Sequence, residues 1–153
     1  MSSRLKHITK LAFQQSACTV VDCGCDHGKV LYWLLKENSD CRAIAIDKSS
    51  QSLEKARKLL ECFGNRVAFF CADGLTCLGN NTYNLLIISG IGGYNIVDIL
   101  TVSKAKFDRI ILSPHRDIDL VKRWLTVNNY VITTDIRIEC RGKEYTILES
   151  KDK

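Results

Sequence analysis

Residues 20–28 read Val-Val-Asp-Cys-Gly-Cys-Asp-His-Gly, a β-branched run that leads into a turn with two glycines. Glycine lets backbone amides approach a ligand closely, and a helix that begins directly after such a turn presents its positive end to that ligand. The spacing is Asp-x-Gly-x-x-x-Gly, with Asp26 where a middle glycine often stands. The stretch predicts a strand, a ligand-binding turn and a helix, which is the repeating unit of open α/β sheets.

Short apolar runs alternate with helical patterns after this stretch. The expected strands are apolar enough to be buried on both faces, as in a parallel sheet, and comprise residues 18–23, 42–46, 67–71, 84–88 and 108–112. The expected helices comprise residues 4–14, 28–37, 49–62, 93–101 and 116–127. This alternation predicts an α/β fold with helices on both faces of the sheet and right-handed crossovers.

The C-terminal part of the chain departs from this alternation. Residues 130–138 and 144–149 alternate in polarity around a short Cys-Arg-Gly-Lys connection, which predicts an antiparallel hairpin. We therefore expect a mostly parallel, seven-stranded Rossmann-like sheet that ends in a hairpin, an arrangement typical of S-adenosylmethionine-dependent methyltransferases. We expect one domain over residues 1–153, with an N-terminal helix in 1–16 and the core in 17–153.

Composition and charge limit the class of protein. Hydrophobic residues make up 46% of the chain and charged residues 25%, which argues against a disordered or collagen-like chain. No apolar run reaches the roughly 18 residues of a membrane span and no signal peptide is recognisable, so we expect a cytoplasmic protein. The net charge of +5 is compatible with a polyanionic partner or with an ordinary solvated surface.

The eight cysteines are expected to be reduced thiols. Several lie inside apolar runs, where cysteine behaves as a small hydrophobic residue, and an intracellular compartment disfavours disulfides. Cys23, Cys25 and His27 lack the pair spacing and the second pair of a zinc site, so we expect no metal.

Two further aspartates follow the next strands of the predicted sheet. Asp47 closes the second strand, where a carboxylate is placed to accept both ribose hydroxyls of a nucleoside cofactor; a cap of the helix near Ser49 is the alternative. Asp73 follows the third strand, where it is placed to accept from an adenine amino group; a plain Asp-Gly turn is the alternative. Because the carboxyl ends of parallel strands meet at one edge of a sheet, we expect these acids to surround one ligand.

A glycine-rich loop, Ser89-Gly-Ile-Gly-Gly93, follows the fourth strand. A loop without side chains lets a flat substrate approach the backbone, although a tight strand-to-helix turn has the same composition. Ser113 and His115 end the fifth strand, but no Gly-x-Ser-x-Gly motif surrounds Ser113, which argues against a hydrolase.

The order of these motifs resembles the bacterial tRNA adenine-N1 methyltransferase family that modifies position 22 of tRNA. The matching segments are VVDCGCDHG (20–28), AIAIDK (43–48), ADGL (72–75), IISGIGG (87–93), IILSP (110–114), RWL (123–125) and GKEYTILE (142–149). The resemblance covers nearly the whole chain. It implies an S-adenosylmethionine-dependent enzyme that releases S-adenosylhomocysteine and acts on tRNA.

The motifs and the resemblance together give three sets of expected site residues. The cofactor-binding set is Asp22, Gly24, Cys25, Asp26, His27, Asp47, Lys48, Ala72, Asp73, Gly74, Ser89, Gly90 and Ile91. The catalytic set is Asp26, His27, Gly90 and His115. The substrate-binding set is Arg4, Lys6, Lys10, Lys29, Gly92, Gly93 and Arg116, and Lys122 and Arg123 are expected to contact RNA from the same helix as Arg116.

Three features depart from the family's pattern. Lys29 stands where the family has an aromatic residue suited to stacking on the target base, and His115 stands where it has an amide suited to pairing with an adenine edge. The family's C-terminal coiled-coil domain is not in this sequence, so we expect weak RNA binding. The resemblance therefore supports the inference of cofactor binding more strongly than the inference of the target base.

The expected chemistry is the attack of adenine N1 on a sulfonium methyl group. N1 carries an exposed lone pair, so the main requirement is positioning, which supplies roughly 7–11 kcal/mol. The product base is cationic, and Asp26 is expected to stabilise the developing charge, with His27 as the alternative polar group. Two other interpretations stay open: a methyltransferase of the same fold for another RNA or a small molecule, and a non-catalytic nucleotide- or RNA-binding module. The oligomeric state is also open.

Overall fold

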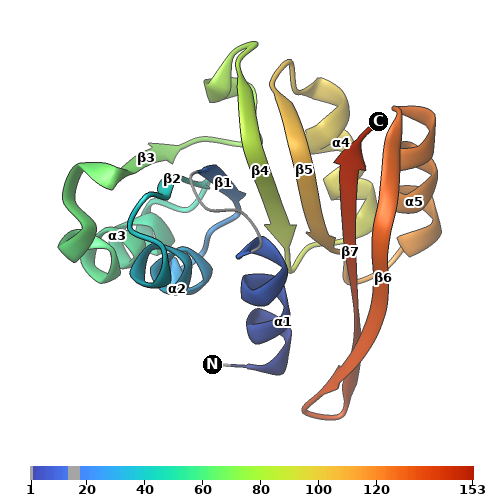
Figure 1. The fold of residues 1–153 in the computed structure, drawn as a ribbon, viewed down its shortest axis with the longest axis horizontal. Coiled ribbons are helices and arrows are strands. Elements are labelled where there is room, and N and C mark those ends of the chain that lie inside the picture. The colour runs from blue at the N-terminus through green and yellow to red at the C-terminus, as the bar shows by residue number, and fades with distance from the viewer. Residues whose placement is uncertain (1, 14–17) are drawn as a thin grey trace.

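Seven strands form one sheet in the order β3-β2-β1-β4-β5-β7-β6 in the computed structural model, which describes residues 2–13 and 18–153 (Figure 1). Their bounds are β1 (Thr19–Cys23), β2 (Arg42–Asp47), β3 (Val67–Cys71), β4 (Thr82–Ser89), β5 (Lys106–Ser113), β6 (Tyr130–Cys140) and β7 (Lys143–Asp152). Strands β1 to β5 are parallel, and β7 pairs antiparallel with both β5 and β6. The predicted mostly parallel sheet with a terminal hairpin is therefore confirmed.

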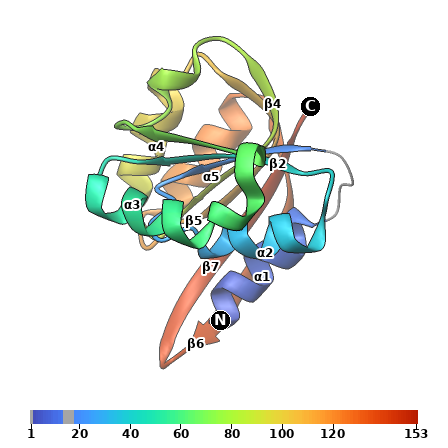
Figure 2. The same ribbon diagram turned by 90° about the vertical axis from the view of Figure 1, so that its left-hand side faces the viewer.

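Helices cover both faces of this sheet, as the alternation predicted (Figure 2). Their bounds are α1 (Ser3–Ala12), α2 (Lys29–Glu37), α3 (Ser50–Leu59), α4 (Gly93–Val102) and α5 (Ile118–Val127), with short 3-10 segments at η1 (Glu61–Arg66) and η2 (Thr76–Leu78). Residues 14–16 of the expected N-terminal helix lie outside the described residues. Within the described part of the chain, no helix is long and apolar enough to cross a membrane.

Two predicted helices are shorter than expected, and their backbones explain why. The helix expected over 49–62 ends at Leu59, and a 3-10 segment follows in which Gly64 takes φ 56°. The helix expected from residue 116 begins at Ile118, because Asp117 takes the left-handed conformation at φ 56° and cannot join the right-handed helix.

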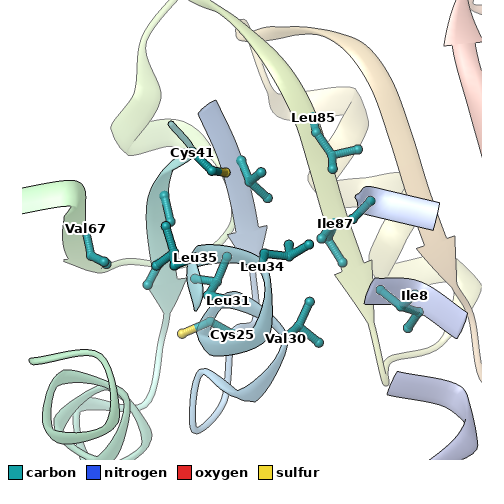
Figure 3. Packing of buried hydrophobic residues seen from close by; sticks show 14 of the residues in the cluster. Ile8, Cys25, Val30, Leu31, Leu34, Leu35, Cys41, Val67, Leu85 and Ile87 are labelled. Atoms are coloured by element: carbon teal, nitrogen blue, oxygen red, sulfur yellow. The ribbon is translucent and has the colours of Figure 1, made fainter. Parts of the chain in front are cut away.

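Two apolar cores lie on opposite faces of the sheet. Helices α1, α2 and α3 pack over one face, where Ile8 of α1 shares a cluster with Val30 and Leu34 of α2 and Ile87 of β4 (Figure 3). Helices α4 and α5 pack over the other, through residues that include Ile96 and Leu125. The central strands are therefore buried on both sides, which holds their carboxyl ends in fixed positions.

Strand β3 differs from its predicted environment. Its sequence, Val-Ala-Phe-Phe-Cys, suggested burial on both faces, but only Val67 is buried and Phe70 is 38% exposed. The reason is its position, because β3 is an edge strand that pairs only with β2.

The β6–β7 hairpin extends past the carboxyl edge of the parallel strands. Leu112 near the end of β5 pairs with Leu148, so residues 143–147 of β7 continue beyond that level, and the tip projects past the arrowheads of β4 and β5 in Figure 1. The connection is tight because Arg141 and Gly142 both take positive φ, at 53° and 76°, which suits a two-residue hairpin turn. The hairpin tip therefore lies beside any ligand bound at the carboxyl edge of the parallel strands.

A buried ion pair connects β5, β7 and α1. The guanidinium of Arg109 donates to Glu149 Oε1 at 2.7 Å, and each side chain is 3% exposed. The Arg109 Nη2 that makes this bond also donates to the carbonyl of Leu11 in α1 at 2.7 Å. Thr134 Oγ1 donates to the other carboxylate oxygen of Glu149. This contact fixes α1 against the sheet near its C-terminal end.

Candidate functional site

A pocket of about 720 Å³ opens at the carboxyl ends of the parallel strands. This volume suits a small-molecule ligand, and the position is where open α/β sheets bind their ligands. Every residue that the sequence predicted for cofactor binding lines it: Asp22, Gly24, Cys25, Asp26, His27, Asp47, Lys48, Ala72, Asp73, Gly74, Ser89, Gly90 and Ile91. The fold thus brings together four loops that are distant in sequence.

The turn after β1 presents open backbone to this pocket. Gly24 takes φ 77°, and a side-chain carbon there would meet no described atom within 4 Å outside its chain neighbours. Its N–H and that of Cys25 both donate to the Ile46 carbonyl, at 2.8 and 3.0 Å, which ties the turn to β2. Gly28 has a different role, because a side chain there would press on Leu60 at 3.1 Å. One glycine therefore opens the site and the other permits helix packing.

Asp47 organises the loops on the ribose side of the predicted site. Its Oδ2 accepts from the Asp26 N–H and its Oδ1 from the Ser49 N–H, both at 2.9 Å. The helix cap is Ser49, whose hydroxyl accepts from the Ser52 N–H, so capping does not explain the aspartate at position 47. Each carboxylate oxygen has a second lone pair, and together they can accept two ligand hydroxyls.

Asp22 is a buried carboxyl group at the base of the pocket, with 3% of the residue exposed. Its pKa is raised from 3.8 to about 7, chiefly by burial and also by the neighbouring carboxylates of Asp47 and Asp26. Asp73 and Asp98 also line the pocket. This concentration of carboxylates favours a ligand that carries positive charge.

The loop after β4 contains three glycines with different surroundings. Gly90 takes φ 83° and lines the pocket, with His115 Nε2 3.9 Å from the position of a side-chain carbon. A side chain at Gly92 would meet Arg116 at 3.2 Å, and one at Gly93 would clash with the Asp117 carbonyl oxygen. Of the three, Gly90 is open to a ligand, and close packing against the segment after β5 accounts for Gly93.

His115 lies at the other end of the pocket, beside α1. Its backbone N–H donates to the Ile91 carbonyl at 2.9 Å, and Arg4 Nη1 lies 3.4 Å from its Nε2. Since a guanidinium only donates, Nε2 serves as the acceptor in this contact, which requires an unprotonated Nε2. Desolvation lowers the pKa of His115, as do Arg4, Lys143 and Arg116, so the ring is held neutral.

The four residues expected to be catalytic line one pocket but fall into two groups. Asp26 takes the left-handed conformation at φ 51°, and its Oδ1 accepts from Ser52 at 3.4 Å and lies 3.5 Å from His27 Nε2. These contacts place Asp26 and His27 next to Asp47, whereas Gly90 and His115 lie at the ends of β4 and β5.

The residues expected to bind substrate are dispersed. Arg4 and Lys29 line the pocket, and Arg116 covers Gly92 at its rim. Lys6 and Lys10 are exposed on α1 and do not line it. Lys122, expected to contact RNA, is paired with Asp135 at 2.6 Å.

Sequence reasoning missed several residues at this site. Asn95 and Asp98 line the pocket from α4, and their spacing of three after the glycine-rich loop was a usable signal, because such residues share a helix face. The Tyr145 ring approaches His115 from the hairpin, with Lys143 two residues before it on β7, and no local sequence pattern predicts this contact.

The cysteines of the β1 turn lie in an apolar setting. Burial raises the pKa of Cys23 to about 12 and that of Cys25 in the same direction, so both are thiols at neutral pH. Across residues 2–13 and 18–153, no group of three or more His, Cys, Asp or Glu side chains is arranged to hold a metal ion.

Comparisons with known proteins agree with this geometry. Residues 1–148 match the family described as "Methyltransferase domain". A Mycoplasma pneumoniae protein provisionally named a tRNA methyltransferase is 31% identical over 150 residues, covering 97% of this chain and 70% of its own. The tRNA (adenine(22)-N(1))-methyltransferase of Bacillus subtilis is 24% identical, and the chain spans 63% of its length. A Streptococcus pneumoniae structure in complex with S-adenosyl-L-methionine, provisionally described as a tRNA (m1A22) methyltransferase, superposes with a TM-score of 0.84 at 26% identity, covering 99% of this chain and 73% of that one.

Proposed function

The chain belongs to the methyltransferase domain family, and on that premise we propose that it is an S-adenosylmethionine-dependent enzyme that methylates N1 of an adenine in tRNA. The observation that carries this proposal is the pocket itself, which gathers all of the predicted cofactor residues at the carboxyl edge of the sheet. The relatives named for tRNA methylation give the substrate class. Such an enzyme acts where tRNA is present, so we place it in the cytoplasm.

The residues of the pocket fit the cofactor in charge and in hydrogen bonding. S-adenosylmethionine supplies, when bound, an electrophilic methyl group on a positively charged sulfur. Asp22, Asp47 and Asp73 provide the negative charge that complements it. Asp47 is assigned to the ribose hydroxyls and Asp73 to the adenine amino group, while the open backbone at Gly24 leaves space for the amino-acid part.

The substrate end of the pocket is assigned to Gly90 and His115. Gly90 leaves the backbone accessible, so a flat base can approach the end of β4 without meeting a side chain. The His115 ring stays neutral, so it adds no positive charge of its own beside a base methylated at N1. The protein's main work is to hold N1 in line with the methyl group, since N1 needs no base to expose its lone pair.

Asp26 and His27 have a smaller role in the proposed reaction than Gly90 and His115. Their contacts with Ser52 and with each other place them on the Asp47 side, where Asp26 shapes the ribose-binding loop through its N–H bond to Asp47. Stabilisation of charge on the target base by Asp26 remains part of the proposal, with Asp26→Asn as its test: slower methyl transfer at unchanged cofactor affinity supports it.

The experiment is labelled-methyl transfer to total tRNA, followed by digestion to nucleosides and their separation. We expect the label in 1-methyladenosine, at a level that depends on Asp47. Label in another nucleoside, or label accepted only by small molecules, would replace the proposed substrate. No transfer to any acceptor, together with retained nucleotide binding, would instead favour a binding module.

A further inference from the structure

Three cations from separate parts of the chain surround His115 at the mouth of the pocket. Arg4 comes from α1, Arg116 from the segment after β5, and Lys143 from the start of β7. Arg116 directly follows His115 in the chain, and Lys143 lies on the same face of β7 as Tyr145, whose ring centre is 6.2 Å from that of His115. These positive charges lie together although like charges repel, which indicates a site for an anion.

None of these cations forms a salt bridge within the described part of the chain. The salt bridges there use other residues, and Glu144, next to Lys143 in sequence, lies 3.9 Å from Arg137 instead. By contrast, the base of the same pocket is lined by carboxylates. The site is therefore polarised, with a negative end for a cationic cofactor and a positive rim facing outward.

Tyr145 holds one of the three cations in place. The Arg4 guanidinium carbon lies 4.9 Å from the centre of the Tyr145 ring, and that ring is 6.2 Å from the His115 ring. A guanidinium over an aromatic face keeps its outer N–H groups available to a second acceptor. The hairpin reaches this position because β7 extends beyond the end of β5.

We propose that Arg4, Arg116 and Lys143 form a binding site for a phosphate of the RNA strand beside the target nucleotide, and that Tyr145 is a positioning residue for Arg4. The inference rests on the proposed function, since it takes Gly90 and His115 as the point where the target base enters. A phosphodiester at this rim would fix the nucleotide next to it over the end of β4. The tip of the β6–β7 hairpin then forms one side of the surface that binds the RNA strand.

The test compares Lys143→Ala with Lys151→Ala. Both lysines are exposed and lie on β7. Lys151, however, lies opposite Arg109 of β5 in the strand register, away from the end of β5 where His115 follows. The measurements are KM and kcat for an unmodified tRNA transcript, the salt dependence of tRNA affinity, and the affinity for S-adenosylhomocysteine. Lys143 does not line the pocket, so its removal should leave the last quantity unchanged.

We expect Lys143→Ala to raise KM for tRNA about tenfold with little change in kcat, as for the loss of a charge-assisted hydrogen bond. The slope of log affinity against log salt should fall by about 0.7 to 0.9, the value for one phosphate contact. Lys151→Ala should change neither. Tyr145→Leu should raise KM like Arg4→Ala, whereas Tyr145→Phe, which keeps the ring, should match the wild type.

Identical KM and salt slope for Lys143→Ala and Lys151→Ala, in a protein that methylates tRNA, would overturn this inference and leave the proposed function standing. A Tyr145→Leu variant with wild-type KM would overturn the positioning role. A wild-type protein that neither binds nor methylates the transcript would contradict the proposed function itself. The two failures are thus distinguished by the activity of the wild type.

Discussion

Asp22 illustrates how a single residue is shaped by the site around it. Asp22 lies in the buried part of β1, and burial together with Asp47 and Asp26 raises its pKa to about 7. Its folded-state pKa therefore lies above the unfolded value, so the folded protein binds more protons than the unfolded chain over this range. Stability that depends on Asp22 is fully present below the unfolded pKa and is lost as pH rises toward 7.

The first prediction concerns pH. The melting temperature of the ligand-free protein should fall between about pH 4 and pH 7, and the fall should be smaller in Asp22→Asn, whose side chain does not ionise. A cationic ligand favours the carboxylate, so cofactor affinity should rise over the same range in the wild type only. Calorimetry at several pH values checks this, and equal pH dependence in wild type and variant would refute the assignment of Asp22.

The second prediction concerns Asp47. Asp47→Ala should weaken binding of S-adenosylhomocysteine by about 1.5–3 kcal/mol, because hydrogen bonds to a charged acceptor are lost. Asp47→Asn keeps one acceptor oxygen and should lose less. Asp40→Ala, an exposed aspartate outside the pocket, is the control and should bind as the wild type does. A folded Asp47→Ala protein with unchanged affinity would exclude Asp47 from the ribose site.

At the scale of elements, the strands and helices were largely predictable because their signals are local. All seven strands appear within a few residues of the five apolar runs and the two alternating runs that predicted them. The exposure of β3 was not predictable, since it depends on β3 being the edge of the sheet rather than on its own sequence. The docking of α1 was equally hidden, because its Leu11 carbonyl is bound by Arg109 from β5.

The third prediction concerns the buried ion pair of Arg109 and Glu149 beside α1. Glu149→Gln or Arg109→Met alone should lower the free energy of unfolding by about 3–5 kcal/mol, because each leaves a buried charge without its partner. The double replacement Arg109→Met with Glu149→Leu should cost much less, since no charge then remains buried. Chemical denaturation of the three variants measures this. Single and double variants of equal stability would contradict the cost assigned to a buried charge without its partner.

At the scale of the whole molecule, the pocket joins a part that sequence could predict and a part that it could not. The predicted cofactor half lies at the carboxyl ends of the strands, where Asp22, Asp47 and Gly90 follow recognisable patterns. The rim proposed to face RNA brings Arg4 and Tyr145 together from opposite ends of the chain, and only the path of α1 and the hairpin reveals this contact. Lys6 and Lys10 lie on the predicted basic helix but outside the pocket, so RNA contact by them stays a prediction.

The fourth prediction addresses the central claim that the methyl group is transferred to adenine N1 in tRNA. A methyl group on N1 blocks the Watson–Crick edge, so reverse transcriptase stops at the modified base. An unmodified tRNA transcript incubated with the wild-type protein and S-adenosylmethionine should give one strong new stop at a single adenine. The stop should weaken in Asp47→Ala and persist in Asp40→Ala. Methyl incorporation without any new stop, or stops at bases other than adenine, would contradict the account.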